Sequence, residues 1–273
     1  MLSQEEELTC RGIADSAVHM GCADRDGKTG CVAGVNTIVL AGGLGTRIRP
    51  ALPGLPKVLA PVAGRPFLEY LLIHLQRQGF HDVTLAVGHM ADHVEAQFGT
   101  GKRLGLHLHY SREHESLGTG GALRLALAVT DSNDLLVLNG DSYFGIDLAA
   151  LLSFHRERRA AATLALARVS DSARYGSVSI GPTREVLAFH EKGEVGGGVI
   201  NAGIYVFRRS VVDAIMPRRV VSLERDAFPR LVGRGLYGII LDGHFVDIGT
   251  LEAYKELCRH PSGLVASVLG GHL

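Results

Sequence analysis

The chain has 273 residues, of which 46% are hydrophobic, and its mean hydropathy is +0.16. Its 28 lysines and arginines balance its 28 aspartates and glutamates, so no overall positive field would attract a nucleic acid. Four cysteines are too few for a disulfide framework, and no apolar run reaches the roughly 18 residues of a membrane-spanning helix. We therefore expect no nucleic-acid or membrane partner, and the composition predicts a cytoplasmic protein.

Residues 1–34 are predicted to form a mobile N-terminal extension. They mix charges, small residues and glycine without sustained periodicity. The first ten residues, MLSQEEELTC, are acidic and contain no apolar run, so they do not read as a secretory signal. We expect the activity of the protein to survive removal of this extension.

From residue 35 onwards, short apolar segments alternate with helical patterns. Strands are predicted at 36–42, 82–88, 134–140, 161–169 and 199–207, and helices at 66–79, 91–99 and 118–129. Such alternation indicates parallel strands joined by crossover helices. Two more strand-like segments, 176–180 and 185–189, precede 199–207 and predict a mixed sheet. The expected fold is a three-layer, Rossmann-like α/β domain over residues 35–260, with a mixed, mainly parallel central sheet and a C-terminal tail at 261–273.

A glycine-rich loop, LAGGLGTRIRP (40–50), directly follows the first predicted strand, where open α/β sheets bind ligands. Its glycines are Gly42, Gly43 and Gly45. They allow close approach of a phosphate to backbone N–H groups, and Arg47 adds a cationic fork. Lys57 follows in the proline-bounded loop LPKVLAPV. The alternative is a tight turn with a solvated arginine, whereas a dinucleotide loop is disfavoured because the pattern is not G-x-G-x-x-G.

Two aspartates follow apolar strands in the same manner. Asp141 ends the segment LLVLNGD, and Asp247 lies in HFVDIGT after the apolar run LYGIILDG. Carboxylates in this position could hold Mg²⁺, which retains several waters and bridges to phosphate oxygens. An ordinary turn aspartate is the alternative for Asp141.

The remaining candidate residues lie at helix and strand ends. In ESLGTGGA, Gly118 and Thr119 open a helix whose free N–H groups suit a base edge or an anion, although Thr119 could simply be its N-cap. The segments RYGSVSI, FHEKGE and VINAGIYVF contribute residue types that bind sugar hydroxyls and phosphate: Tyr175, Gly176, Glu191, Lys192 and Asn201. Each of these five, taken alone, could equally be an ordinary surface residue.

Taken in order, these segments resemble the sugar-1-phosphate nucleotidyltransferases of the glycosyltransferase-A-like fold. The resemblance covers residues 36–258 and rests on eight segments: LAGGLGTRIRP, LPKVLAPV, LGTGGA, NGD, YGSV, EKGE, NAGIYVF and FVDIGT. It implies an enzyme that joins a nucleoside triphosphate to a sugar 1-phosphate and releases pyrophosphate with Mg²⁺ as cofactor. Because the acceptor phosphate is already anionic, this chemistry needs positioning and charge stabilisation rather than a protein nucleophile.

The resemblance also implies a role for each candidate residue. Arg47 would hold the β- and γ-phosphates and Lys57 the α-phosphate, as the catalytic residues, while Asp141 and Asp247 would bind the metal. The nucleotide would contact Leu40, Ala41, Gly42, Gly43, Gly45, Thr46, Gly118, Thr119 and Asp141. The sugar phosphate would contact Tyr175, Gly176, Glu191, Lys192 and Asn201.

Within this family the chain looks most like the guanylyltransferases that act on D-glycero-α-D-manno-heptose 1-phosphate, mainly because of SLERDAFP (222–229). GTP is therefore the favoured nucleotide. The alternatives are an N-acetylmuramic acid 1-phosphate uridylyltransferase and a mannose or glucose 1-phosphate nucleotidyltransferase. A non-catalytic relative that binds a nucleotide sugar and regulates a partner is the alternative of another class. The sequence does not determine the oligomeric state, and a homo-oligomer is possible.

Overall fold

The computed structural model describes residues 34–270 apart from 173, 192, 194–195 and 216–218. The predicted extension, except Gly34, and the predicted sugar-phosphate residue Lys192 thus lie outside the described residues.

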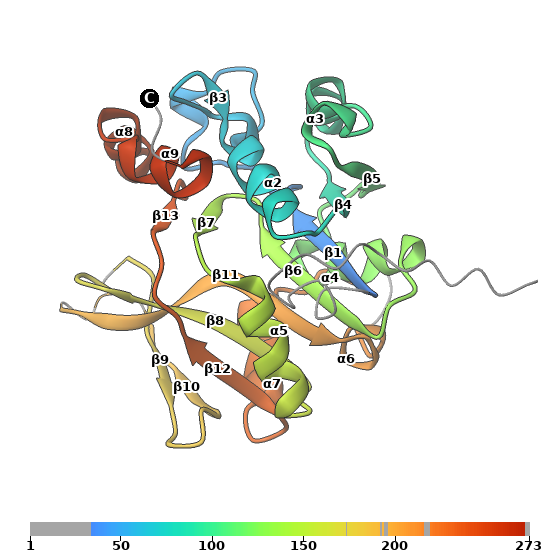
Figure 1. Cartoon of the computed structure of the whole chain (residues 1–273), viewed down its shortest axis with the longest axis vertical. Helices are drawn as coiled ribbons and strands as arrows, with labels where there is room; N and C mark the ends of the chain where they lie inside the picture. The colour runs from blue at the N-terminus through green and yellow to red at the C-terminus, as the bar shows by residue number, and fades with distance from the viewer. Residues whose placement is uncertain (1–33, 173, 192, 194–195, 216–218, 271–273) are drawn as a thin grey trace, which may run out of the picture.

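A seven-stranded sheet runs through the centre of the molecule in the order β12-β8-β11-β6-β1-β4-β5 (Figure 1). Its strands are β1 (Val35–Leu40), β4 (Asp82–Val87), β5 (His107–Arg112), β6 (Asp134–Asn139), β8 (Ala162–Val169), β11 (Gly198–Arg208) and β12 (Leu236–Ile240). Neighbouring strands are parallel except at β11, which is antiparallel to both β6 and β8. The prediction of a mixed, mainly parallel sheet is confirmed.

The mixed character arises from a different element than the sequence indicated. Strands β9 (Val178–Ile180) and β10 (Val186–Phe189) pair with each other in a separate antiparallel ribbon. Two further short pairs join β2 (Pro61–Val62) to β3 (Arg65–Pro66) and β7 (Ser142–Phe144) to β13 (Phe245–Asp247). Only β11 therefore introduces an antiparallel direction into the described central sheet.

Helices cover both faces of the sheet and create two apolar cores, which confirms the predicted three layers. Along β6 the side chains alternate: Leu136 and Leu138 enter one core, and Leu135 and Val137 enter the other. The first core is completed by α2 (Phe67–Arg77), α3 (Ala91–Phe98), α5 (Leu148–Glu157), α8 (Leu251–Arg259) and α9 (Ser262–Leu269). The second is completed by α4 (Gly118–Ala126), α6 (Arg209–Asp213) and α7 (Phe228–Leu231).

The C-terminal segment is part of the domain, which corrects the predicted tail from residue 261. Leu264, Val265 and Val268 of α9 are buried in the first core, and α9 packs on α2. Arg77 of α2 donates to the carbonyl of Val268, and the Ser267 hydroxyl lies 2.8 Å from that of Tyr143. The helix has only eight residues and no charged one, so its apolar face produced no recognisable period in the sequence.

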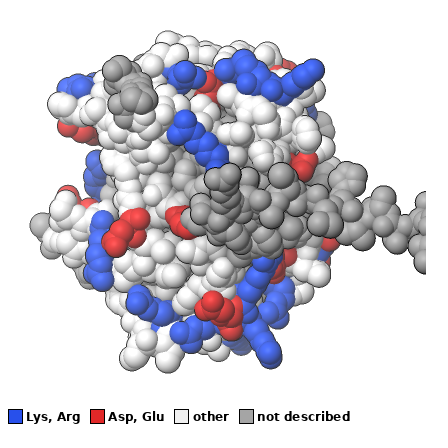
Figure 2. Space-filling model, in the orientation of Figure 1, with Lys and Arg blue, Asp and Glu red and all other residues white. Residues whose placement is uncertain are grey.

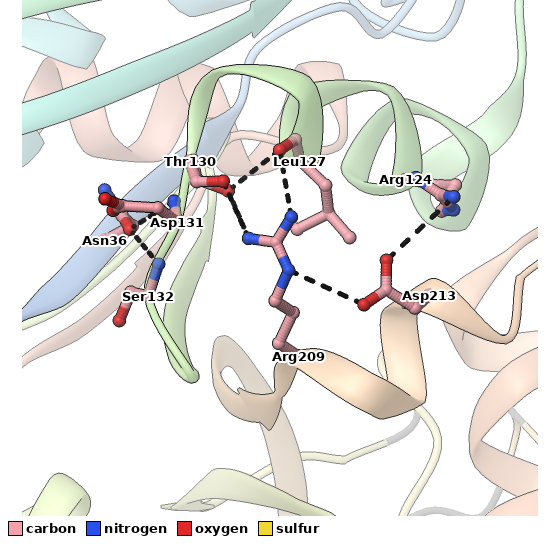
Figure 3. Close-up of polar contacts among 8 residues, drawn as sticks. All are labelled: Asn36, Arg124, Leu127, Thr130, Asp131, Ser132, Arg209 and Asp213. Carbon is pink, nitrogen blue, oxygen red and sulfur yellow. Dashed lines mark hydrogen bonds and ion pairs between the residues drawn. The ribbon is translucent and has the colours of Figure 1, made fainter.

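Helix α4 is fixed to α6 at the end far from the glycine-rich loop (Figure 3). The guanidinium of Arg209 donates to the carbonyl oxygens of Thr130 (2.7 Å) and Leu127 (3.4 Å), which follow the helix. Asp213 of α6 lies 3.5 Å from Arg209 Nε and 3.9 Å from Arg124 Nη2 of α4. These contacts fix the C-terminal end of α4, the end opposite Gly118. None of the described helices combines the length and apolar composition needed to cross a bilayer.

Candidate active site

A pocket of about 290 Å³ opens where β1 and β6 end. Seven predicted residues line it: Leu40, Gly42, Gly43, Lys57, Gly118, Thr119 and Asp141. Six further residues complete its wall: Val58, Glu113, Ser116, Ala122, Asn139 and Glu224. On the face shown in Figure 2, basic and acidic side chains are interspersed and neither sign dominates. Any selectivity for an anion must therefore come from local groups in the pocket.

Two glycines of the loop after β1 are required by close packing. A Cβ on Gly42 would lie 2.7 Å from the Glu113 carboxylate, and one on Gly45, where φ is +56°, would lie 2.9 Å from Lys57 Cβ. Gly43, by contrast, faces open space at the pocket. The absence of a side chain at Gly43 therefore leaves space in the pocket for a ligand, whereas at Gly42 and Gly45 it allows other protein atoms to pack closely.

Four predicted residues of this loop lie outside the pocket wall. Thr46 and Arg47 are exposed, and Ala41 is buried with its N–H donated to the carbonyl of Ala86 (2.8 Å). Gly45 instead lines a neighbouring, largely apolar pocket of about 260 Å³. Lys57 also borders that pocket, so it separates the two.

Lys57 and Asp141 form an ion pair at the mouth of the pocket, with Nζ 2.6 Å from Oδ2. The lysine side chain is 9% exposed and that of the aspartate 39%, so the amine is the more enclosed partner. Lys57 begins a 3₁₀ turn, Lys57–Leu59, whose next two side chains are buried. Asp141 is brought close to β1 through Gly140, whose N–H donates to the carbonyl of Leu40 (2.9 Å).

Asp247 lies close to Asp141. Strand β13 pairs with β7 so that Asp247 is opposite Ser142, and the N–H of Ile248 donates to the carbonyl of Asp141 (3.0 Å). Burial raises the pKa of Asp247, and the negative charge of Asp141 raises it further. The Gly249 N–H, 2.8 Å from Oδ1, acts in the opposite direction.

Two adjacent carboxylates whose charges repel are a suitable donor set for a divalent cation. No group of three or more histidine, cysteine or acidic side chains is arranged for a metal in the described part of the chain. A cation held by Asp141 and Asp247 would thus keep most of its coordination positions for water and substrate oxygens. This is the arrangement expected of a magnesium ion that also binds phosphates, and the residues present fit it.

The predicted sugar-phosphate residues lie on the other side of Asp247. The ring of Tyr175 packs edge-on against Phe245 of β13, with centroids 5.5 Å apart, and its hydroxyl accepts from Arg174 (2.7 Å). Burial and the charge of Asp247 both raise the pKa of Tyr175. The structure therefore places Tyr175 near Asp247, although Tyr175 does not line the 290 Å³ pocket.

The other members of that set are less closely grouped. Gly176 has φ +75°, and a Cβ there would lie 2.6 Å from the carbonyl of His190, next to the exposed Glu191. Asn201 lies on β11, where the register with β8 shifts between it and Tyr205. Neither Gly176, Glu191 nor Asn201 lines the 290 Å³ pocket.

Thr119 does not act as the N-cap of α4. Its hydroxyl accepts from Leu223 N (2.8 Å) and donates to Glu224 Oε2 (3.1 Å), so it joins α4 to a segment about a hundred residues later. Gly118 allows this approach: its φ is +70°, and a Cβ would lie 2.6 Å from the carbonyl of Val221. The alternative of a plain N-cap at Thr119 was therefore wrong.

Four polar residues of the pocket were not among the predicted ones: Glu113, Ser116, Asn139 and Glu224. Glu113 directly follows β5, so the strand-end rule that found Asp141 would also have found it. Asn139 is the last residue of β6, two positions before Asp141. Glu224 belongs to the SLERDAFP segment, which was recognised as a unit without any residue being assigned a role.

Glu113 is a half-buried carboxylate beside the glycine loop. Its Oε2 accepts from the Leu117 N–H at 3.1 Å, while Oε1 is the atom that would collide with a Cβ on Gly42. Burial raises the pKa of Glu113, and the Leu117 N–H lowers it. The site therefore combines an acceptor at one end, between Gly42 and Gly118, with the Lys57 and aspartate cluster at the other.

Comparison with known proteins agrees with this geometry. Residues 36–261 match the family described as nucleotidyl transferase. Mannose-1-phosphate guanylyltransferase from Mycobacterium tuberculosis is 42% identical, over 81% of this chain and 62% of that protein. D-glycero-alpha-D-manno-heptose 1-phosphate guanylyltransferase from Aneurinibacillus thermoaerophilus is 35% identical, over 81% of this chain and 96% of that protein.

The fold also matches solved structures. The crystal structure of HddC from Yersinia pseudotuberculosis complexed with GMP-PN aligns with a TM-score of 0.74 and 29% identity, over 82% of this chain and 98% of that one. This chain thus spans less than two thirds of the mycobacterial relative but nearly all of the two other proteins. The matched segment contains the whole pocket, and the chain belongs to the nucleotidyl transferase family.

Proposed function

We propose that this protein is a sugar-1-phosphate guanylyltransferase, which transfers GMP from GTP to the 1-phosphate of a manno-configured sugar and releases pyrophosphate. The observation that carries the proposal is the ion pair of Lys57 and Asp141 in the wall of a pocket lined by the glycine loop, with Asp247 close to Asp141. Cation, carboxylate pair and backbone N–H groups are the parts that phosphoryl transfer requires.

The proposed reaction needs no nucleophile from the protein. An oxygen of the sugar phosphate forms a new bond to the α-phosphorus of GTP, and the bond from that phosphorus to the bridging oxygen of pyrophosphate breaks. Lys57 would stabilise the charge on the α-phosphate, and the exposed Arg47 of the glycine-containing loop would contact the departing β- and γ-phosphates. Mg²⁺ held by Asp141 and Asp247 would supply further charge neutralisation when bound.

Glu113 favours guanine as the base. Guanine presents two adjacent donors, N1–H and the N2 amino group, on its Watson–Crick edge, and a carboxylate can accept from both. Uracil and thymine present carbonyl oxygens beside their single ring N–H, and these would face the negative charge of Glu113. The names of the guanylyltransferase relatives and the GMP-PN complex of the Yersinia protein support the same base.

For the sugar, we propose D-glycero-α-D-manno-heptose 1-phosphate. Two proteins named for that substrate, from Aneurinibacillus thermoaerophilus and Campylobacter jejuni, are each 35% identical to this chain. Mannose 1-phosphate is the second candidate, because the mycobacterial relative named for it is 42% identical. The two sugars share the manno configuration of the ring, so both proposals describe the same subsite around the anomeric carbon. A reaction that consumes GTP would take place in the cytoplasm.

The experiment is an assay of pyrophosphate release with Mg²⁺. Each of GTP, UTP, dTTP, CTP and ATP is paired with the 1-phosphates of heptose, mannose, glucose and N-acetylmuramic acid. Turnover confined to GTP and one of the two manno sugars would support the proposal and choose between them. Turnover with UTP and N-acetylmuramic acid 1-phosphate would overturn the base and sugar assignments. Tight binding of a nucleotide sugar without any turnover would favour the regulatory alternative.

A further inference from the structure

The SLERDAFP segment forms a single turn of π-helix, Leu223–Ala227, whose second residue enters the pocket. Turns of π-helix are rare and often occur at functional sites. Here the turn is fixed at its start, because the Ser222 hydroxyl accepts from Arg225 N (3.2 Å) and the buried Leu223 anchors it to the second core. The turn therefore holds Glu224 in the pocket wall rather than leaving it at the surface.

The carboxylate of Glu224 is oriented by three hydroxyl groups. Oε2 accepts from Thr119 (3.1 Å) and from Ser222 (3.0 Å), and the hydroxyl of Tyr205 lies 3.5 Å from Oε1. A carboxylate has about four lone-pair sites, so Oε1 retains capacity for another donor. None of the described residues places a lysine or arginine against Glu224 within ion-pair distance. The group is thus prepared to accept a hydrogen bond from a ligand.

Tyr205 connects Glu224 to the acceptor side of the site. Its fully buried hydroxyl accepts from Asn201 (3.0 Å) and from Asn139 (3.4 Å), and Asn139 also lines the pocket. Burial raises the pKa of Tyr205 well above its ordinary value, and the charges of Glu224 and Asp141 act in the same direction. Both carboxylates therefore lie near this hydroxyl, which also links Glu224 to Asn201, one of the predicted sugar-phosphate residues.

We propose that Glu224 accepts a hydrogen bond from a hydroxyl of the acceptor sugar next to its anomeric carbon, the C2 hydroxyl. This inference rests on the proposed function. The phosphate on C1 must reach the Asp141 and Lys57 cluster, so the hydroxyl on the adjacent carbon comes closest to that cluster and to the acceptors beside it. Because C2 is the centre at which mannose and glucose differ, Glu224 would select the manno configuration.

A site that hydrogen-bonds a substrate hydroxyl discriminates strongly against analogues that lack or misplace it, since its own polar group is then left without a partner. The support from Thr119 and Ser222 strengthens this effect because the carboxylate cannot easily turn away. For a charged acceptor, the loss corresponds to roughly 10- to 100-fold in kcat/KM.

The test compares wild-type enzyme with Glu224→Gln, using mannose 1-phosphate, its 2-deoxy analogue and glucose 1-phosphate at saturating GTP. We expect wild type to prefer mannose 1-phosphate over the 2-deoxy analogue by roughly 10- to 100-fold. In Glu224→Gln this preference should fall to a few-fold, and the preference over glucose 1-phosphate should shrink with it. The KM for GTP should change little.

The controls separate recognition from folding. Glu113→Gln, which changes the pocket carboxylate assigned to the base, should raise the KM for GTP while leaving the preference between the three sugar phosphates unchanged. Tyr205→Phe removes the orienting hydroxyl and should reduce the same preference less than Glu224→Gln does. The 2-deoxy comparison in wild type requires no variant, so it tests the assignment even if a substitution impairs folding.

Three outcomes would overturn the assignment. Equal use of mannose 1-phosphate and its 2-deoxy analogue by wild type would show that the enzyme does not bind the C2 hydroxyl. If Glu224→Gln kept the wild-type preference for mannose 1-phosphate, another group would bind that hydroxyl. A rise confined to the KM for GTP would place Glu224 at the ribose instead. In all three cases turnover by wild type leaves the proposed function standing, whereas absence of turnover by wild type with every pair overturns both.

Discussion

Lys57 Nζ lies 2.6 Å from Asp141 Oδ2, although the two residues are 84 positions apart in the chain. Without ligand the lysine neutralises one of the two carboxylates that would hold the metal. Asp141 and Asp247 are the residues that would hold the metal, and the amine of Lys57 would contact a phosphate oxygen of the bound triphosphate. The pair thus keeps both groups in place and charge-balanced before the substrates arrive.

The two aspartates should be indispensable to turnover. Asp141→Asn and Asp247→Asn keep the shape of the side chain but remove a charge from the cation site, so kcat/KM for pyrophosphate release should fall by roughly 10²- to 10³-fold. Higher Mg²⁺ should recover part of the loss. Circular dichroism should match wild type, and rates close to normal in either variant would contradict the metal assignment.

The variant Arg47→Ala tests whether the exposed arginine of the glycine loop contacts the triphosphate. Arg47→Ala should raise the activation barrier by about 3 kcal/mol, the scale of one preorganised charge contact, without altering stability. Arg234→Ala removes another exposed arginine, located outside the pocket between α7 and β12, and should leave kcat/KM unchanged. Equal rates in the two variants would remove Arg47 from the site.

Replacement of Glu113 should change the nucleotide preference. In Glu113→Gln the amide can accept only through one oxygen, so the KM for GTP should rise by roughly 10- to 100-fold. UTP, which has carbonyl oxygens that the new NH₂ group can meet, should become a comparatively better substrate. The ratio of kcat/KM values for the two nucleotides is the measurement. A ratio equal to that of wild type would mean that guanine is read elsewhere.

Replacement of Gly118 should lower the unfolding free energy for two reasons, the positive φ of its backbone and the crowding around its Cα. Gly118→Ala places a Cβ 2.6 Å from the carbonyl of Val221 at φ +70°, whereas Gly233→Ala has nearly the same φ (+71°) with nothing within 4 Å. The second variant should lose about 1 kcal/mol of unfolding free energy, and the first clearly more. Urea denaturation measures the difference, and equal losses would show that the contact with Val221 can yield.

Acid should destabilise the fold between about pH 6.5 and 4. Burial lowers the pKa of both His74 and His155 to about 4, below the ordinary value of 6.5 expected in the unfolded chain. In this range the unfolded chain takes up protons that the folded protein does not, so stability falls as the pH falls. Each histidine contributes at most about 1.4 kcal/mol per pH unit, and the loss levels off below about pH 4.

His155 can be examined separately from His74. Its Nδ1 lies 2.9 Å from the hydroxyl of Thr163, and its buried Nε2 has no hydrogen-bond partner. His155→Gln should reduce the slope of unfolding free energy against pH by about half, whatever its effect on stability at pH 7. Denaturant titrations at pH 7, 6, 5 and 4 give the slope, and a slope like that of wild type would assign the acid sensitivity to other groups.

The sequence predicted those parts of the fold that have strong local periodicity. The strands containing Ile38, Leu85 and Val137, and the helix beginning at Phe67, were all identified because apolar residues repeat over a sufficient length. Helix α5 was missed, although Asp147 accepts from Ala149 N and Ala150 N as an N-cap should. Helix α9 was missed because its burial depends on α2, which lies far away in the chain.

Prediction of the site was limited in the same way. Asp141 follows β6 at the carboxyl end of the central sheet, and the rule that ligands bind at such ends is available from sequence. Lys57 reaches it from a 3₁₀ turn and Asp247 from the separate β7–β13 pair, so their approach is not given by that rule. Glu224 reaches the pocket only because a π-helical turn, 105 positions after Thr119, packs against α4. No local pattern encodes that contact. The residue was therefore visible only once the chain had folded.

The alternation of side chains along β6 has a consequence for how this protein can change. A deletion or insertion of one residue within 134–139 would exchange the leucines of one core for the leucine and valine of the other, and would also turn Asn139 and displace Asp141. Fold and catalysis would be lost in one step. We expect relatives to differ in length at the β9–β10 ribbon, which forms its own pair, while the length of β6 stays constant.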